Sequence, residues 1–233
     1  MTSLLKLTML FILYTSITCV SKDISQEEQE LMDQINKIPI NQNKELILCE
    51  TTKGNIEIEV DFEWAPVGAA RFVQLVQEEY FTDMAFYDAR PDFLVKFGIS
   101  NDNIFKDSLH WSNQPISRER FNFKQVVKKH YISFISDNNN VDARTHHFYI
   151  ALVDLPYLSG DSPFGRIVKG RENFDNINTE YEDEVDLSLF MKKGNAYLRK
   201  EFPRLDYIKK CTVITKPEDN KKVDPKAAKK TEI

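Results

Sequence analysis

Short runs of β-type residues recur along most of the chain, and this pattern restricts the fold more than any other sequence feature. After a turn at 51–54, apolar Ile56, Ile58 and Val60 alternate with polar residues, as in a strand with one buried face. Residues 65–76 have helical spacing, with a proline in the first turn. Many short strands with few helices predict an antiparallel sheet or barrel. Further β-type runs lie at 85–89, 93–99, 131–136, 147–153, 165–168 and 207–215.

The two ends of the chain differ in character from its middle. Residues 1–21 contain Lys6, a short apolar run and then small residues, which is typical of a cleaved secretory signal peptide rather than an uncleaved anchor helix. Residues 22–45 are predicted to form a polar helix and a linker. Residues 216–233, with six lysines and two prolines, are predicted to form a disordered charged tail. One folded domain is therefore expected at 46–215.

Composition and spacing exclude several classes of function. The net charge of −5 argues against a nucleic-acid-binding protein, because such proteins neutralise phosphates with lysine and arginine. After signal cleavage no membrane span is expected, since no later stretch approaches the roughly 20 apolar residues that one needs. Neighbouring His146 and His147 point to opposite faces of a strand, and the three cysteines lack C-x-x-C spacing, so neither a metal nor a cofactor is expected. The acidic residues at 180–186 lack the ligand pattern of a calcium loop and are expected to lie in an exposed loop.

Four segments combine into a recognisable series of motifs. They are TTKGNIEIEV…APVGAARFVQLV, FYDARPDFLVKFGIS, HYISFIS…ARTHHFYIALVDLPYLSGDSPFGRIVKG and GNAYLRKEFPRLDYIKKCTVI. In this order and spacing, over about 46–215, they resemble the cyclophilin family of peptidyl-prolyl cis–trans isomerases. The resemblance implies a mainly β fold, an eight-stranded antiparallel barrel with capping helices, and a proline-binding groove on the outer face.

The resemblance also implies where in the cell the protein acts. Cyclophilins of this branch assist the folding of proteins in the secretory pathway, with proline-containing peptides or proteins as partners. Residues 230–233 have the rough shape of an ER-retrieval tetrapeptide but end in isoleucine rather than leucine. Secretion and retention in the ER lumen therefore both stay open, and the sequence predicts no particular oligomeric state.

The catalytic position of the family is altered in this chain. Rotation about an Xaa–Pro bond has a barrier of about 20 kcal/mol, and the proline nitrogen gains a basic lone pair when the bond is twisted. Cyclophilins aim an arginine at that nitrogen and support it with a glutamine. Aligned on Phe86, Pro91 and Phe93, the arginine position is Asp88 and the glutamine position is Lys96. An ionised aspartate only accepts hydrogen bonds, so the resemblance predicts an isomerase whose activity is weak or lost.

Two charged residues could compensate for the altered position. The family's arginine and glutamine are neighbours in space, which predicts an ion pair between Asp88 and Lys96. Arg90, two residues along the strand and on the same face, is a candidate substitute for the missing arginine. The alternative function is a non-catalytic proline-peptide-binding or assembly subunit that uses the cyclophilin fold.

The remaining groove positions are partly kept. His147 stands where the family has a glutamine that bonds the substrate backbone, and Phe93 matches the aromatic floor of the proline pocket. The other expected substrate-binding residues are Leu94, Tyr149, Tyr157 and Leu158. Alternatively, Phe93 and Tyr149 are simply core aromatics.

Two cysteines are a candidate disulfide. Signal cleavage removes Cys19 and leaves Cys49 and Cys211 in an oxidising compartment, where free buried thiols are the alternative. The first and last strands of the cyclophilin fold pair, so the resemblance places Cys49 and Cys211 on neighbouring strands.

Overall fold

The computed structural model describes residues 43–100, 110–117, 119, 125–135, 144–158 and 162–214. The predicted signal peptide, most of the 22–45 segment and the predicted tail at 216–233 lie outside these residues. The described helices are α3 (Pro66–Gln77), α5 (Arg171–Asp175), α6 (Leu187–Lys193) and α7 (Asn195–Glu201). The described strands are β1 (Lys44–Thr51), β2 (Gly54–Asp61), β3 (Met84–Ala85), β4 (Asp88–Ala89), β5 (Leu94–Phe97), β6 (Tyr131–Phe134), β7 (Phe148–Ala151), β8 (Gly165–Lys169) and β9 (Tyr207–Val213).

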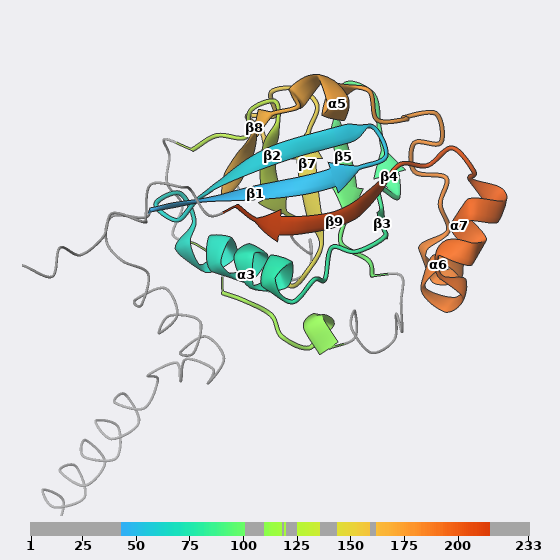
Figure 1. Ribbon diagram of the computed structural model, residues 1–233, viewed down its shortest axis with the longest axis horizontal. Helices are drawn as coiled ribbons and strands as arrows, with labels where there is room; N and C mark the ends of the chain where they lie inside the picture. Colours follow the sequence, from blue (N-terminus) through green and yellow to red (C-terminus); the bar gives the residue numbers. More distant parts are fainter. Residues whose placement is uncertain are drawn as a thin grey trace, which may run out of the picture.

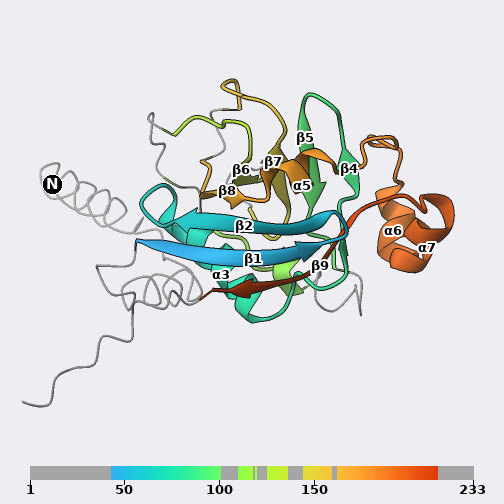
Figure 2. The same ribbon diagram turned by 45° about the horizontal axis from the view of Figure 1, so that its top comes forward.

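All these strands belong to one antiparallel sheet with the order β3-β9-β1-β2-β8-β6-β7-β5-β4. The two strands at its ends, β3 and β4, are separated in the chain by Phe86 and Tyr87 alone. The backbone amide of Phe86 donates to the carbonyl of Asp206 (3.0 Å), and that of Tyr87 donates to the carbonyl of Lys96 (3.1 Å). The chain itself thus joins the two edges, and the sheet curls around its core as a barrel (Figures 1 and 2).

The antiparallel, mainly β fold predicted from the sequence is confirmed, with one correction to the strand count. Nine strands are present where eight were expected, because the predicted strand at 85–89 is divided into β3 and β4. The division has a physical reason: β3 pairs with β9, whereas β4 pairs with β5 at the other edge of the sheet. One segment cannot run straight while bonding to two different neighbours.

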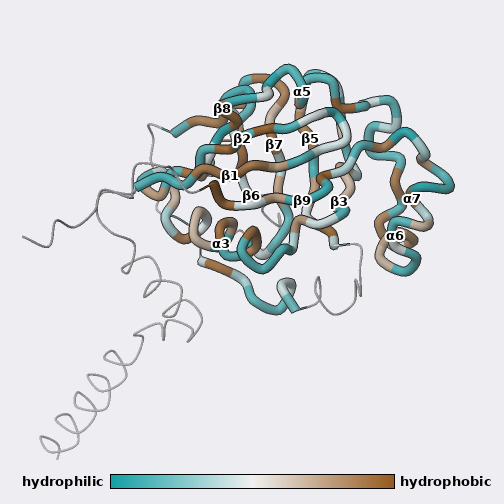
Figure 3. The backbone as a smooth tube through the Cα atoms, viewed as in Figure 1, coloured by the Kyte–Doolittle hydropathy of each residue, from teal (hydrophilic) through white to brown (hydrophobic). Residues whose placement is uncertain are grey.

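The core inside the barrel is rich in aromatic residues. Phe72, from α3, lies with its ring centroid 5.3 Å from that of Phe148 on β7, and Phe148 stacks on Phe97 of β5 at 5.5 Å. The alternation predicted for β2 is present, since Ile56, Ile58 and Val60 are buried. Hydrophobic segments accordingly lie on the central strands, whereas the chain around α5 is mainly hydrophilic (Figure 3). Inward-facing side chains therefore fill the barrel, which leaves its outer face for binding.

A disulfide joins the first and last strands of the barrel. Cys49 of β1 and Cys211 of β9 are register partners, and their sulfur atoms are bonded. A bridge between residues so far apart in the chain stabilises a fold by about 2–4 kcal/mol, mainly by restricting the unfolded state. Within the described part of the chain, none of the helices is both long and apolar enough for a membrane crossing.

Candidate functional site

A row of four side chains crosses the outer face of the barrel from β4 to β6. The register pairs Asp88 with Lys96, Lys96 with Tyr149, and Tyr149 with Ser133. Residues directly opposite one another in antiparallel strands point to the same face of the sheet. The charged and aromatic positions singled out in the sequence are therefore neighbours on one surface.

Asp88 is held by two cations at the charged end of this row. Only 8% of its side chain is exposed, and Lys96 Nζ lies 2.6 Å from its Oδ2. Arg90 donates from Nε to Oδ1 and from Nη2 to Oδ2 of Asp88, both at 3.1 Å, and its Nη2 also lies 2.8 Å from Asp183 Oδ2. The hydrogen bonds that Arg90 donates to Asp88 raise the pKa of Arg90. Two carboxylates and two cations lie together, so the formal charges of this cluster cancel.

The tight β4–β5 hairpin explains why Arg90 reaches back to Asp88. The amide of Arg90 donates to the carbonyl of Leu94 (3.0 Å), and the amide of Phe93 donates to the carbonyl of Arg90 (3.2 Å). Asp92 in the turn has a φ of 55°, a left-handed conformation that aspartate tolerates better than most residues. This turn places Arg90 just beyond β4, on the side of the sheet where Asp88 lies.

The acidic segment at 180–186 forms the wall beside the charged cluster. Its acidic side chains are exposed, as expected, but its backbone is attached to the barrel: the amide of Ala89 donates to the carbonyl of Glu182 (3.1 Å). Asp186 then caps α6, with Oδ1 accepting from the amides of Ser188 and Leu189. The segment is therefore an ordered edge of the site rather than a free loop.

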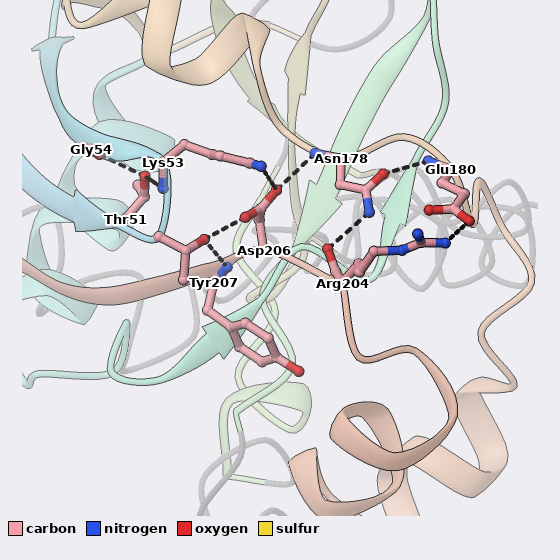
Figure 4. Close-up of polar contacts among 9 residues, drawn as sticks. Thr51, Lys53, Gly54, Asn178, Glu180, Arg204, Asp206 and Tyr207 are labelled. Atoms are coloured by element: carbon pink, nitrogen blue, oxygen red, sulfur yellow. Dashed lines mark hydrogen bonds and ion pairs between the residues drawn. The ribbon is translucent and has the colours of Figure 1, made fainter.

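A buried carboxylate anchors the start of this wall. Asp206 accepts from the amide of Asn178 (2.7 Å) and from the hydroxyl of Thr52 (2.6 Å), and Lys53 Nζ lies 3.5 Å from it (Figure 4). The side-chain amide of Asn178 also donates to the carbonyl of Arg204 (2.9 Å). These bonds tie the loop before residue 180 to the β1–β2 turn and to the start of β9.

A cleft of about 360 Å³ lies between the wall and the sheet. The sheet and its adjoining loops contribute one side, and the wall with the first residue of α6 contributes the other. It is lined by Tyr87, Asp88, Arg90, Lys96, Ile135, His147, Asp183, Val185 and Leu187.

His147 is a neutral group at the base of this cleft. Burial, assisted by the charge of Lys96, lowers its pKa to about 4, and its Nδ1 lies 3.4 Å from the Tyr87 hydroxyl. A neutral imidazole has one donor and one acceptor, like the amide that the family carries there. The backbone beside His147 passes very close to Gly98. Gly98 has a φ of +123°, and a Cβ on it would lie 2.1 Å from the carbonyl oxygen of His146. Only glycine allows β5 to end so close to the strand that carries His147.

The other end of this face, beside Tyr149 of the row, is apolar. Leu94 and Tyr149 are buried in a cluster on the outer face that is separate from the main core, and Phe93 and Leu158 pack against it while partly exposed. The structure therefore brings together four of the expected proline-pocket residues. Tyr157 is not part of this cluster, and it is 68% exposed.

These two ends differ in the chemistry that they offer. The apolar cluster is suited to a proline ring, whereas the charged end directs its nearest cations at a carboxylate. In the described part of the chain, no group of three or more His, Cys, Asp or Glu residues is placed to hold a metal ion. Sequence reasoning did not identify Ile135, Val185 and Leu187 as lining residues, because their contacts arise only when distant segments pack. The acidic run was the one visible signal of the wall.

Comparisons with known proteins place this geometry in a family. The model of the cyclophilin type peptidyl-prolyl cis-trans isomerase/CLD family matches residues 46–213. The chain is 28% identical over 145 residues to peptidyl-prolyl cis-trans isomerase A of Dickeya dadantii, covering 60% of this chain and 74% of that protein. It is 25% identical over 138 residues to a peptidyl-prolyl cis-trans isomerase of Acinetobacter baylyi, covering 57% and 71%.

The solved structures agree with this assignment at the level of the fold. A crystal structure of a Cryptosporidium parvum cyclophilin type peptidyl-prolyl cis-trans isomerase superposes with a TM-score of 0.55 at 16% identity, covering 75% of this chain and 99% of that one. The cyclophilin AquaCyp293 from Hirschia baltica gives a TM-score of 0.54 at 15% identity, covering 74% and 75%. With the family model matched over 46–213, this chain belongs to the cyclophilin-type peptidyl-prolyl cis–trans isomerase family.

Proposed function

We propose that this cyclophilin domain binds proline-containing segments of proteins and isomerises their Xaa–Pro bonds weakly or not at all. One observation carries the proposal. The side chain at the family's arginine position is a carboxylate, Asp88, and it is already bonded to Lys96 and Arg90. The two nearest cations are therefore directed away from an incoming proline nitrogen.

Whether this site can catalyse rotation depends on what it offers to the twisted transition state. Only interactions that are stronger in that state than in the ground state accelerate the rotation. A carboxylate cannot donate to the developing nitrogen lone pair, and Arg90 donates to Asp88 and Asp183 instead. Removal of a single well-placed donor slows enzymes by about 10²–10³-fold, so we expect a loss of at least this size relative to an intact site.

Binding is supported by the apolar end of the same face. Leu94 and Tyr149 form a buried floor, and Phe93 and Leu158 lie partly exposed above it. The charged cluster of Asp88, Lys96, Arg90 and Asp183 is made of other residues. Loss of the catalytic arginine therefore leaves the surface for a proline ring in place.

We further propose that the protein works in the secretory pathway, either secreted or in the ER lumen. The Cys49–Cys211 disulfide supports this, because disulfides persist in oxidising compartments. Thiol titration of the non-reduced protein, purified from a secretory host after expression of the full chain, is expected to find neither cysteine reactive. Two reactive thiols in the folded protein would contradict the proposal.

An isomerase assay on a short Xaa–Pro peptide tests the proposed function. The native protein is compared with Asp88→Arg and with Asp88→Arg/Lys96→Gln, and peptide binding is measured in parallel. Glu172→Arg, an equal charge change at an exposed residue of α5, is the control. We expect the native protein to bind the peptide with little turnover, and only the double variant to show higher turnover.

Two outcomes would change this conclusion. Turnover by the native protein at the level of an intact cyclophilin would show that Asp88 does not block catalysis, and Arg90→Ala would then test whether Arg90 supplies the donor. Absence of any binding to proline peptides would instead favour a subunit that uses the barrel only as a rigid surface.

A further inference from the structure

Three apolar side chains line the cleft beside Asp88. Ile135, just after β6, lies on the side of the sheet, whereas Val185 of the wall and Leu187 at the start of α6 lie on the other side. Leu187 remains 41% exposed although it is a large apolar residue. At about 360 Å³, the cleft is large enough to receive a ligand side chain.

The wall beside the cleft carries an excess of negative charge, and Glu182 is close enough to Arg90 to help raise the pKa of that residue. The segment at 180–187 has five acidic residues and neither lysine nor arginine. Glu180 pairs with Arg204 and Asp183 with Arg90, while Asp186 caps α6. Glu182 and Glu184 are exposed and add negative charge beyond these pairs. The cations inside the cleft do not offset this excess, because Arg90 and Lys96 are balanced by Asp88 and Asp183.

An apolar lining beside an acidic wall fits a long cationic side chain. Lysine and arginine bury their aliphatic stems along apolar surface while the charged head stays near water. A glutamate in the same place would be repelled by these acids, so a peptide that carries glutamate there should bind more weakly. The charge complementarity therefore selects lysine or arginine over both acidic and short residues.

The distance from the proline pocket indicates where this side chain lies in the ligand. Leu94 belongs to the apolar end and Lys96 lines the cleft, and two residues along a strand span about 7 Å. An extended peptide covers a similar length in about two residues. We infer that the cleft is a specificity subsite that selects a lysine or arginine about two residues from the bound proline. This inference depends on the proposed binding of proline peptides.

A set of labelled Ala-Pro peptides tests the inference by fluorescence anisotropy. Lysine, alanine or glutamate is placed at each of the three positions on either side of the Ala-Pro unit, and affinity is measured at low and high salt. At one position we expect the lysine peptide to bind up to about fivefold more tightly than the alanine peptide, the range given by exposed charge pairs, and the glutamate peptide to bind more weakly than the alanine peptide. High salt should reduce this ratio, because it screens exposed charges.

Two variants separate the effect of the acidic residues of the wall from that of general surface charge. Glu182→Gln/Glu184→Gln removes the excess negative charge while keeping Asp183 as the partner of Arg90, and it should remove most of the lysine preference. Glu172→Gln, on α5 outside the cleft lining, should leave the preference as it is in the native protein.

The outcomes distinguish this inference from the proposed function. If all proline peptides bind with affinities independent of the flanking charge, the subsite is refuted and the proposed function stands. The same holds if glutamate is preferred, or if the double variant keeps the native preference. If no proline peptide binds, both the proposed function and the subsite are overturned.

Discussion

The two ends of the outer face of β5 differ in character: one end is apolar, and the other is charged. Leu94 lies in the apolar cluster with Tyr149, whereas Lys96, two residues along, is bonded to Asp88. The inward-facing residues between and beside them, Val95 and Phe97, belong to the barrel core. Because alternate residues of a strand face opposite sides, the charged end can change without disturbing that core.

The two ends are also stabilised by different forces. The apolar end depends on burial, which is worth about 1.5–3 kcal/mol for each large apolar side chain. The charged end depends on mutual neutralisation, because Asp88 is nearly buried and its charge would destabilise the fold without a cation beside it. Binding and catalysis thus reside in separable groups, and each end can be tested on its own.

The largest expected effect is at the apolar end. Tyr149 is 2% exposed, so Tyr149→Ala should leave a cavity and lower the free energy of unfolding by about 3–5 kcal/mol. Tyr149→Phe keeps the ring and should cost much less. Urea denaturation of both variants measures the difference, and equal losses would show that ring packing is not what holds this end together.

A smaller effect is expected from the ion pair at the charged end. A double-mutant cycle with Asp88→Asn and Lys96→Met should give a coupling energy of about 1–2 kcal/mol, within the range for contacting groups. Glu50 and Lys210 provide a matched control, because they are also antiparallel register partners with an ion pair (3.2 Å) but are exposed. That pair should couple by less than about 1 kcal/mol. Equal coupling in the two cycles would remove the distinction.

A pH-dependent effect should arise from His147. Its pKa in the folded protein, about 4, is below the ordinary 6.5, so the unfolded chain takes up the proton more readily. The resulting stability is complete above pH 6.5 and is lost as the pH falls towards 4.

The melting temperature as a function of pH measures this contribution. The native protein should lose more stability than His147→Gln over this range. His146, whose pKa burial lowers to about 2 with a smaller contribution from His147, adds to the loss in the same direction in both proteins. Parallel curves would contradict the assignment of a neutral, half-buried imidazole.

The smallest effect on stability is expected at Tyr157, at the border of the apolar end. Because its side chain is 68% exposed, Tyr157→Ala should change the free energy of unfolding by less than about 0.5 kcal/mol. If the proline-binding surface extends to this residue, peptide affinity falls while stability does not. An unchanged affinity would confine the apolar end to the cluster around Leu94 and Tyr149.

Much of the fold could be predicted because local patterns and distant partners agreed. The alternation of Ile56, Ile58 and Val60 indicated a strand with one buried face, and all three residues are buried. Alignment on the motif around Phe93 led to the expected neighbours Asp88 and Lys96, which are register partners in β4 and β5. The cyclophilin resemblance supplied this expectation, and the short hairpin between the two residues brings them into register.

The wall of the site could not be predicted in the same way. Five acids at 180–186 are equivalent in the sequence, but only Asp183 meets Arg90 and only Glu182 bonds through its backbone to Ala89. The sequence predicted only an exposed loop, because these acids lack the ligand pattern of a calcium site. Asp206 and Asn178 fix the path of this segment, and such contacts exist only once β9 has packed beside β1.

The sequence by itself determined the mainly β fold, the family and the change of charge at Asp88, because these depend on residue type and order along the chain. Tertiary structure alone decided that Asp88 is shared between Lys96 and Arg90, and that the acidic wall closes a cleft beside them. The physical reason is distance: side-chain charges interact strongly over only a few ångströms, and folding selects which distant groups come that close.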